Sequence, residues 1–176
     1  KLAALKNEAA KLSNEEFHKK LSRVFTDLHD LHTNYIAPKP LSCAATFIPL
    51  RFDSAMDGNK SMVLVSAKLK LKADAVAEVN VGDELVSING EAVTQVLERL
   101  DQVSGGANPD AMRVRAVEML SLRSLSTQDV PEEDELKLEL LRDGKKVEVT
   151  VPWFAYRNLD CEGSTERTDE EKISLR

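Results

Sequence analysis

The 176-residue sequence predicts an α+β fold, in which N-terminal helices precede a β-sandwich or barrel that carries a helical insertion. Three observations predict this fold. Apolar residues recur at helical spacing over the first 31 residues. Short runs that are branched-rich or alternating, which is typical of half-buried strands, follow from residue 46. Two further helical patterns separate the earlier runs from the last two.

The N-terminal helical region contains a start signal and a stop signal. Ser13 and Glu16 fit a capping box, in which a serine and a glutamate three residues later satisfy each other's backbone amides. We therefore expect two helices, or one kinked helix, over residues 1–31. The segment "APKP" at 37–40 ends any helix, because proline lacks the amide donor.

The expected strands are short and are bounded by turn residues. The last two flank Asp143-Gly144, a strong hairpin signal because both residues tolerate positive φ. The runs that we predict as strands are 46–52, 61–71, 84–88, 135–142 and 145–153.

Two helices are expected between these strands. One follows the segment "NGEAV" and covers residues 94–103. The other starts at Asn108, an N-cap residue that precedes a proline at the first helical position, and runs to about Leu125. Its apolar face contains Ala116 and Leu120.

These elements divide the chain into three parts. Residues 1–40 form the N-terminal helical region, and residues 41–153 form the β-rich domain with a helical insertion at about 105–130. Residues 154–176 are mostly polar and charged, so we predict a tail or a connector there.

Composition excludes several classes of partner. The net charge is -6, and the 24 basic residues are interleaved with 30 acidic ones, so no basic face for nucleic acid is expected. No stretch approaches 18 consecutive apolar residues, so we expect no membrane span. Cys43 and Cys161 are compatible with one disulfide or with two free thiols. With no paired-cysteine motif for zinc, we expect neither a metal nor a cofactor.

The most specific motif is "VNVGDELVSINGEAV" at 79–93. It combines a turn glycine, a short buried strand and an Asn-Gly turn before a helix, and in this order it resembles the PDZ domain. The resemblance implies a peptide groove between the strand 46–52 and the helix 94–103, which binds an extended peptide by strand addition. The residues expected to contact the peptide are Ala45, Thr46, Phe47, Ile48, Val96, Leu97 and Leu100.

The sequence departs from the PDZ pattern at two places. The stretch 41–50 has no glycine for a loop that holds a peptide carboxylate, and Pro49 removes a donor from the expected strand. We therefore expect no carboxylate capture by that loop. The insertion at 105–130 is absent from a minimal PDZ domain, and we expect it to cover the groove or to contact a neighbouring domain.

The segment "DLHDLHTNYIAP" at 27–38 holds two of the chain's three histidines. His29 and His32 would lie on nearly the same face if the helix continued. Three interpretations are open: a metal site, a helix C-terminus where a protonated histidine meets the dipole, and a catalytic base. A straight helix does not bring four consecutive side chains around one ion, which disfavours the metal site.

Taken together, residues 15–153 resemble the front half of the S41 peptidases, the family of C-terminal processing and tail-specific proteases. The segment with the two histidines, the strand "ATFIPLRF" and the PDZ motif carry this resemblance. It is nearest to the branch that includes the chlamydial protease-like activity factor and tricorn protease. The resemblance implies that His32 is a general base, and that the catalytic serine belongs to a C-terminal domain absent from this chain. It also implies a secreted, periplasmic or cell-surface protein.

The resemblance thus implies the recognition and regulatory part of a secreted S41-type serine endopeptidase, which binds an extended peptide or protein substrate, and this chain alone is expected to be inactive. Two alternatives remain. One is a stand-alone PDZ-like interaction module without protease activity. The other is a dimerisation element, in which apolar residues of 109–125 pack on a second copy to form a homodimer.

Overall fold

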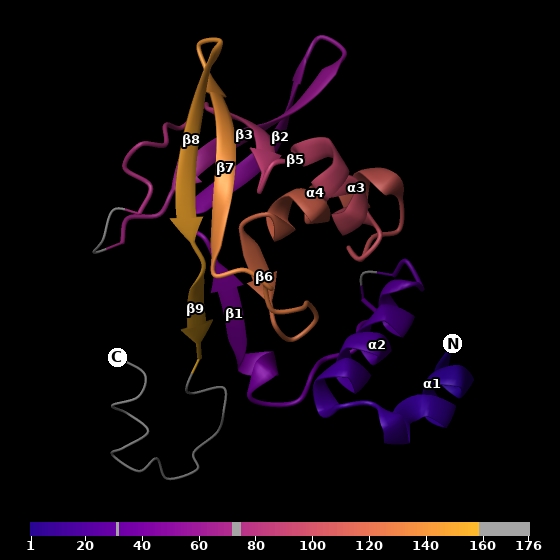
Figure 1. Cartoon of the computed structure of the whole chain (residues 1–176). Coiled ribbons are helices and arrows are strands. Elements are labelled where there is room, and N and C mark those ends of the chain that lie inside the picture. Colours follow the sequence, from indigo (N-terminus) through magenta and orange to yellow (C-terminus); the bar gives the residue numbers. More distant parts are fainter. Residues whose placement is uncertain (31, 72–74, 159–176) are drawn as a thin grey trace, which may run out of the picture.

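A six-stranded antiparallel sheet forms the centre of the part of the chain that this computed structural model describes, which is residues 1–30, 32–71 and 75–158 (Figure 1). The strand order is β2-β3-β4-β7-β8, and β5 pairs with β4. The bounds are β2 (Leu50–Asp57), β3 (Lys60–Lys68), β4 (Glu84–Ile88), β5 (Glu91–Ala92), β7 (Glu135–Arg142) and β8 (Lys145–Pro152). The predicted strands 84–88 and 135–142 have these same bounds.

A second, three-stranded sheet has the order β6-β1-β9 and contains β6 (Leu122–Ser124), β1 (Ala44–Phe47) and β9 (Phe154–Arg157). The single strand predicted over 46–52 is therefore split between the two sheets. The split falls at Ile48-Pro49, because Pro49 has no amide to donate to a ladder. Within the described residues neither sheet closes into a barrel, so the fold is α+β with open sheets.

The helices are α1 (Leu2–Glu8), η1 (Ala9–Lys11), α2 (Asn14–Thr26), η2 (Leu41–Cys43), α3 (Val93–Asp101) and α4 (Pro109–Met119). Helices α2 and α4 begin directly after the predicted cap residues, α3 begins one residue before its predicted start, and the short helices η1 and η2 were not predicted. Ser13 and Glu16 form the complete capping box at the start of α2. Asn108 caps α4, and its side chain accepts a hydrogen bond from the Ala111 amide at 2.9 Å. Figure 1 shows α2 on the side of the loop that follows β6, and Ser22 Oγ of α2 donates to the Thr127 carbonyl of that loop.

The stretch predicted as a tail from residue 154 begins with β9. This strand pairs with β1, and Phe154 stacks on Phe47 with ring centroids 5.7 Å apart. Residues 159–176, which include Cys161, lie outside the described residues, while Cys43 is buried at the end of η2. Two aromatic rings thus extend the β-rich domain beyond its predicted boundary.

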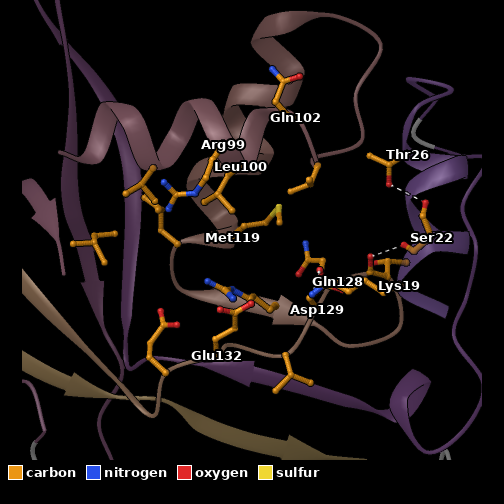
Figure 2. Close-up of a pocket in the computed structure, with 18 of the residues that line it drawn as sticks. Lys19, Ser22, Thr26, Arg99, Leu100, Gln102, Met119, Gln128, Asp129 and Glu132 are labelled. Carbon is orange, nitrogen blue, oxygen red and sulfur yellow. Dashed lines mark hydrogen bonds and ion pairs between the residues drawn. The ribbon is translucent and has the colours of Figure 1, made fainter. Parts of the chain in front are cut away.

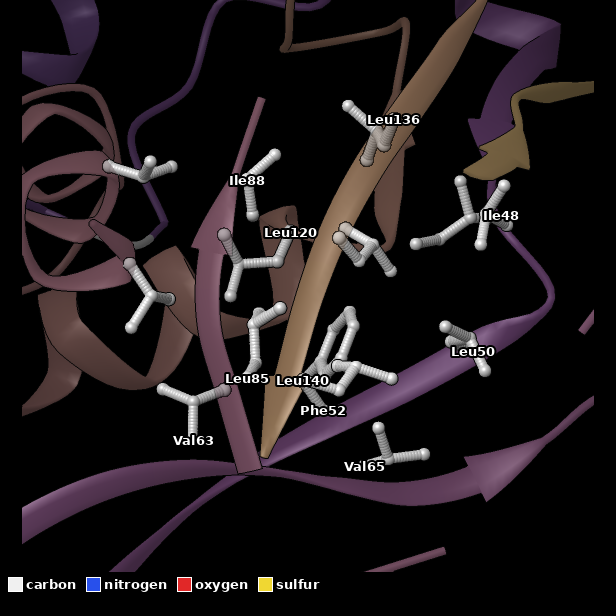
Figure 3. Close-up of a cluster of buried hydrophobic side chains, with 14 of the residues drawn as sticks. Ile48, Leu50, Phe52, Val63, Val65, Leu85, Ile88, Leu120, Leu136 and Leu140 are labelled. Carbon is white, nitrogen blue, oxygen red and sulfur yellow. The ribbon is translucent and has the colours of Figure 1, made fainter. Parts of the chain in front are cut away.

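The hydrophobic core lies between the six-stranded sheet and the helices α3 and α4. Figure 3 shows Leu120, which follows α4, among side chains of β2, β4 and β7. The residues labelled there with it include Leu50, Phe52, Leu85, Ile88, Leu136 and Leu140. The helical insertion is therefore part of the core.

The Gly-Asp pair of the PDZ-like motif has a structural role. Gly82 has a φ of 97°, a conformation that favours glycine, and it turns the chain into β4. The next side chain, Asp83, is only 2% exposed. Its carboxylate accepts hydrogen bonds from Arg142 Nε at 2.8 Å and Nη2 at 2.7 Å, and from the Asn80 amide at 2.8 Å. The hydrogen bonds from Arg142 are the main cause of the lowered pKa of Asp83.

We expect Asp83→Asn to lower the free energy of unfolding by about 1.5–3 kcal/mol at pH 7, because Arg142 loses a charged acceptor. A group whose pKa is lowered by folding stabilises the protein above its unfolded pKa, which is about 3.9 for aspartate. This contribution is lost as the pH falls through the folded pKa, so the difference between wild type and Asp83→Asn should begin to shrink below about pH 4 and disappear only below the folded pKa of Asp83. Urea unfolding across pH measures this difference.

The exposed pair of Asp53 and Arg51, with atoms 3.4 Å apart, offers the control. Asp53→Asn should change stability by less than about 1 kcal/mol. A constant difference between wild type and Asp83→Asn at all pH values would contradict the role given to this carboxylate.

Candidate functional site

The segment that carries His32 begins where α2 ends. The helix stops at Thr26, and the amides of Leu28 and His29 bond to the carbonyl groups of Phe25 and Thr26 at 3.0 and 3.1 Å. His29 then takes a left-handed conformation with a φ of 53°. The helix predicted to residue 31 is thus shorter, and the two histidines do not share a helical face. His32 also lies beyond the last turn, where the helix dipole has little effect.

The imidazole of His32 is on the surface, with 92% of its side chain exposed. Its Nδ1 lies 3.7 Å from Asp30 Oδ1, and its backbone amide donates to the same oxygen at 2.9 Å. The Thr33 hydroxyl donates to Asp30 Oδ2 at 2.5 Å. The hydrogen bonds from Thr33 and then from the His32 amide lower the pKa of Asp30. An ionised carboxylate therefore lies beside an accessible imidazole.

Within the described ranges, no group of three or more histidine, cysteine or acidic side chains is arranged to hold a metal ion. Asp27, His29, Asp30 and His32 therefore do not form such a group.

An aromatic anchor holds the chain just after His32, and the sequence analysis missed it. The Tyr35 hydroxyl lies 2.6 Å from His18 Nδ1, and the two rings are stacked with centroids 5.8 Å apart. Tyr35 also stacks on Phe25 at 6.2 Å. His18 is therefore half-buried against the segment that follows His32, and this contact fixes the end of that segment to α2.

The part of the expected peptide-binding strand that forms β1 has both edges paired by the chain itself, whereas residues 50–52 belong to β2, which pairs only with β3 in the described sheet. Ala45, Thr46 and Phe47 face β6 on one side and β9 on the other. The Ile48 amide donates to the Ser121 carbonyl at 2.9 Å. Strand addition to β1, as predicted from the sequence, therefore requires displacement of β6 or β9 in this conformation.

The helix that was expected to form the other wall of the groove packs against other parts of the chain. Val96 and Leu97 of α3 are 8% and 3% exposed and belong to the core, whereas Leu100 is half-buried. Helix α4 packs against both α3 and β2, where the groove was expected (Figure 1). The structure thus separates the seven predicted contact residues: Ala45, Thr46 and Phe47 pair with β6 of the insertion, Ile48, Val96 and Leu97 lie in the core, and Leu100, with one edge of Val96, lines an open cleft. Their role in peptide binding stays a prediction.

The insertion is fastened to α3 by a charged contact. Arg113 Nε and Nη2 donate to the Asp101 carboxylate at 3.0 and 2.6 Å. Most apolar residues of α4 and its C-terminus face the chain's own core, since Ala116 and Leu120 are 0% and 2% exposed, whereas Val114 and Leu122 are 57% and 53% exposed. The buried residues are not available to a second copy, and the dimerisation alternative stays a prediction for the exposed ones.

A cleft of about 600 Å³ lies between the N-terminal helices and the β-rich domain. Figure 2 shows Lys19, Ser22 and Thr26 projecting from α2 on one side, and Arg99 and Leu100 from α3 on the other. Residues 127–130, Glu132 and Glu133 border the cleft as well, and Ser22 Oγ donates to the Thr127 carbonyl at 3.0 Å. Sequence patterns gave no signal for this cleft, because its walls are far apart along the chain.

Comparison with known proteins gives one family and one recurring fold. Residues 45–162 match the PDZ domain family. No curated protein matches this chain. Mature CPAF, a chlamydial protease-like factor, has a TM-score of 0.69 at 19% identity, over 98% of this chain and 30% of its own. Mature CPAF complexed with lactacystin has a TM-score of 0.68 at 21% identity, over 88% and 28%.

A mutant of CPAF matches similarly, with a TM-score of 0.68 at 20% identity over 88% of this chain and 27% of that one. The chain therefore spans less than a third of the length of the CPAF structures that it matches. At these identities the likeness is one of fold. Among the described residues, no helix is both long enough and apolar enough to cross a membrane.

Proposed function

This chain belongs to the PDZ domain family, and we propose that it is the peptide-recognition and regulatory part of a secreted serine endopeptidase of the S41 type. In this proposal His32 is the general base, and the serine nucleophile lies in a domain outside residues 1–176. PDZ domains bind extended peptides, which supplies the recognition function. The fold shared with CPAF over most of this chain supports a protease as the parent protein.

The exposed imidazole of His32 is the observation that carries the proposal. A general base that serves a serine on another domain has to lie on the surface where that domain docks. His32 meets this requirement, with 92% of its side chain exposed. The carboxylate of Asp30, 3.7 Å from Nδ1, is placed to orient the ring and to stabilise the imidazolium that forms during proton transfer.

The insertion supports the regulatory half of the proposal. Helix α4 and strand β6 fill the region between β2, α3 and β1, which the PDZ resemblance assigns to a peptide. A ligand that enters by strand addition to β1 must therefore compete with a segment of the chain itself. Only molecules in which this segment has moved away from β1 can bind the ligand. The apparent affinity is therefore the intrinsic affinity multiplied by the fraction of such open molecules.

A fluorophosphonate probe, which reacts with activated serines, tests this division of roles. We expect the longer protein encoded by the same gene to hydrolyse casein and to be labelled on one serine outside residues 1–176. The 176-residue chain alone should neither hydrolyse casein nor be labelled. Labelling within residues 1–176, or a longer protein that neither reacts nor hydrolyses casein, would contradict the proposal, and the second result would favour a PDZ interaction module.

A further inference from the structure

Three buried polar side-chain atoms have no hydrogen-bond partner within the described residues, and they form one cluster. They are Thr46 Oγ1, Arg123 Nε and Trp153 Nε1. Thr46 and Arg123 face each other across β1 and β6, and the Arg123 guanidinium lies 5.0 Å from the centroid of the Trp153 ring. A buried donor without a partner costs about 1–3 kcal/mol, so a cluster of such atoms indicates a missing acceptor.

Arg123 also has no close ion pair in the described part of the chain. Burial lowers the pKa of its guanidinium, and Glu133, Asp129 and Glu132 oppose this shift from a distance. Asp129 is already paired with Lys19, whose Nζ lies 3.4 Å from Oδ2. The guanidinium therefore retains donors for a further carboxylate, which is the partner that its planar geometry fits best.

Arg123 lines the cleft of about 600 Å³ that lies between α2 and α3. This volume is within the usual range for ligand sites, which often lie between domains. The apolar side chains that line the cleft are Ile88, Val96, Leu100, Val103, Met119, Leu120, Val130 and Leu136. Charged residues line the cleft as well: Lys19 is paired with Asp129, Arg99 is paired with Glu91, and Arg23, Glu132 and Glu133 are also present. Arg123 has no close ion pair among the described residues, and beside the apolar part of the lining it suits a ligand with an apolar side chain and a carboxylate.

We propose that this cleft binds the extended peptide, with an apolar side chain of the peptide on the floor and a peptide carboxylate on Arg123. The inference rests on the proposed function, which supplies a peptide as the ligand, and it moves the recognition site away from the filled groove between β2 and α3. The proposed binding site is also close along the chain to the candidate base. Thr26, the last residue of α2, lines the cleft, and the chain leads from it into the segment that carries His32.

Fluorescein-labelled decapeptide pools, titrated against the 176-residue chain, test this site. Each peptide contains one leucine, and its randomised positions exclude aspartate and glutamate. The three pools differ only in their carboxylate: the first has a free C-terminal carboxylate, the second has a C-terminal amide, and the third has a C-terminal amide and one internal glutamate. We expect the neutral amide pool to bind at least about tenfold more weakly than one of the other two. The better of those two identifies the carboxylate as terminal or side-chain.

Arg123→Gln should weaken binding of the carboxylate pool by about tenfold or more, since a charge-assisted contact is lost. Arg23→Gln is the matched control, because Arg23 lines the same cleft but is exposed, and we expect a change below about threefold. If melting shows that Arg123→Gln does not fold, Arg123→Lys replaces it and should weaken binding by the loss of the fork geometry.

Amide chemical shifts of the wild-type chain provide a readout that needs no variant. When the pool with the highest affinity is added, the amide shifts of α2, of the second half of α3 and of residues 127–133 should change. Shifts confined to β1 and β2, or full affinity in both Arg123 variants, would overturn this site and leave peptide recognition standing. Failure of every pool to bind would contradict both the site and peptide recognition by this chain.

Discussion

Replacing His32 by alanine in the intact protein will lower kcat by about 10⁴-fold or more, with little change in KM or in the melting temperature. The imidazole is proposed to take the proton from serine and return it to the leaving amine, and both steps disappear with the ring. Packing is not affected, because 92% of the side chain is exposed. Steady-state kinetics with a quenched fluorescent peptide, combined with thermal melting, measures both parts of this prediction.

His29 provides the matched control for this experiment. It is exposed and lies three residues before His32, and its φ of 53° is one that asparagine also tolerates. His29→Asn should keep kcat within about twofold of wild type. Equal losses in both variants, or full activity in His32→Ala, would exclude His32 as the base.

Local signals in the sequence located most helix starts and turns correctly. Ser13 and Asn108 cap α2 and α4 as predicted, since a capping contact involves residues within three positions. Asn89-Gly90 and Asp143-Gly144 have the positive φ values that their turns require. These features depend on chemistry within a few residues, so one sequence contains enough information to predict them.

Pairing between distant segments explains where the sequence predictions failed. The helix expected to reach Leu125 stops at Met119, because residues 122–124 pair with β1 as β6. The residues after 153 were predicted as a polar tail, yet Phe154 and its neighbours pair with β1 on its other edge. Neither segment has a strand pattern long enough to recognise, and each forms only because β1 offers an edge.

In the candidate site, too, features that depend on neighbouring residues could be predicted, and features that depend on distant pairing could not. His32 was proposed as a base from its residue type and its place between the helices and the PDZ motif, both of which are visible in one sequence, and its role stays a prediction. The cluster of Thr46, Arg123 and Trp153 was not found, because it depends on the register of β1 against β6 and on a cation-π contact. The segment "MLSLRSLS" contains an arginine between leucines, which is a weak signal in the sequence. It indicates a ligand site only once the arginine is known to be buried.

Leu120→Ala will lower the free energy of unfolding by about 2–5 kcal/mol, the range for a buried leucine that leaves a cavity. Leu120 is 2% exposed and lies in the core with Leu50 and Phe52 of β2. Figure 3 shows it surrounded by strands of the large sheet. Chemical denaturation followed by tryptophan fluorescence measures the loss, because Trp153 packs against the same core.

Leu122→Ala is the matched control, since this leucine is two residues further along the chain but 53% exposed on β6, and we expect a change within about 0.5 kcal/mol. The comparison decides whether the insertion is part of the core or a detachable cover. If α4 left the groove easily, Leu120→Ala would cost no more than Leu122→Ala. A large difference means that opening the groove exposes the core side chains of the insertion. A peptide then has to bind where the surface is already open, and the cleft beside Arg123 is such a place.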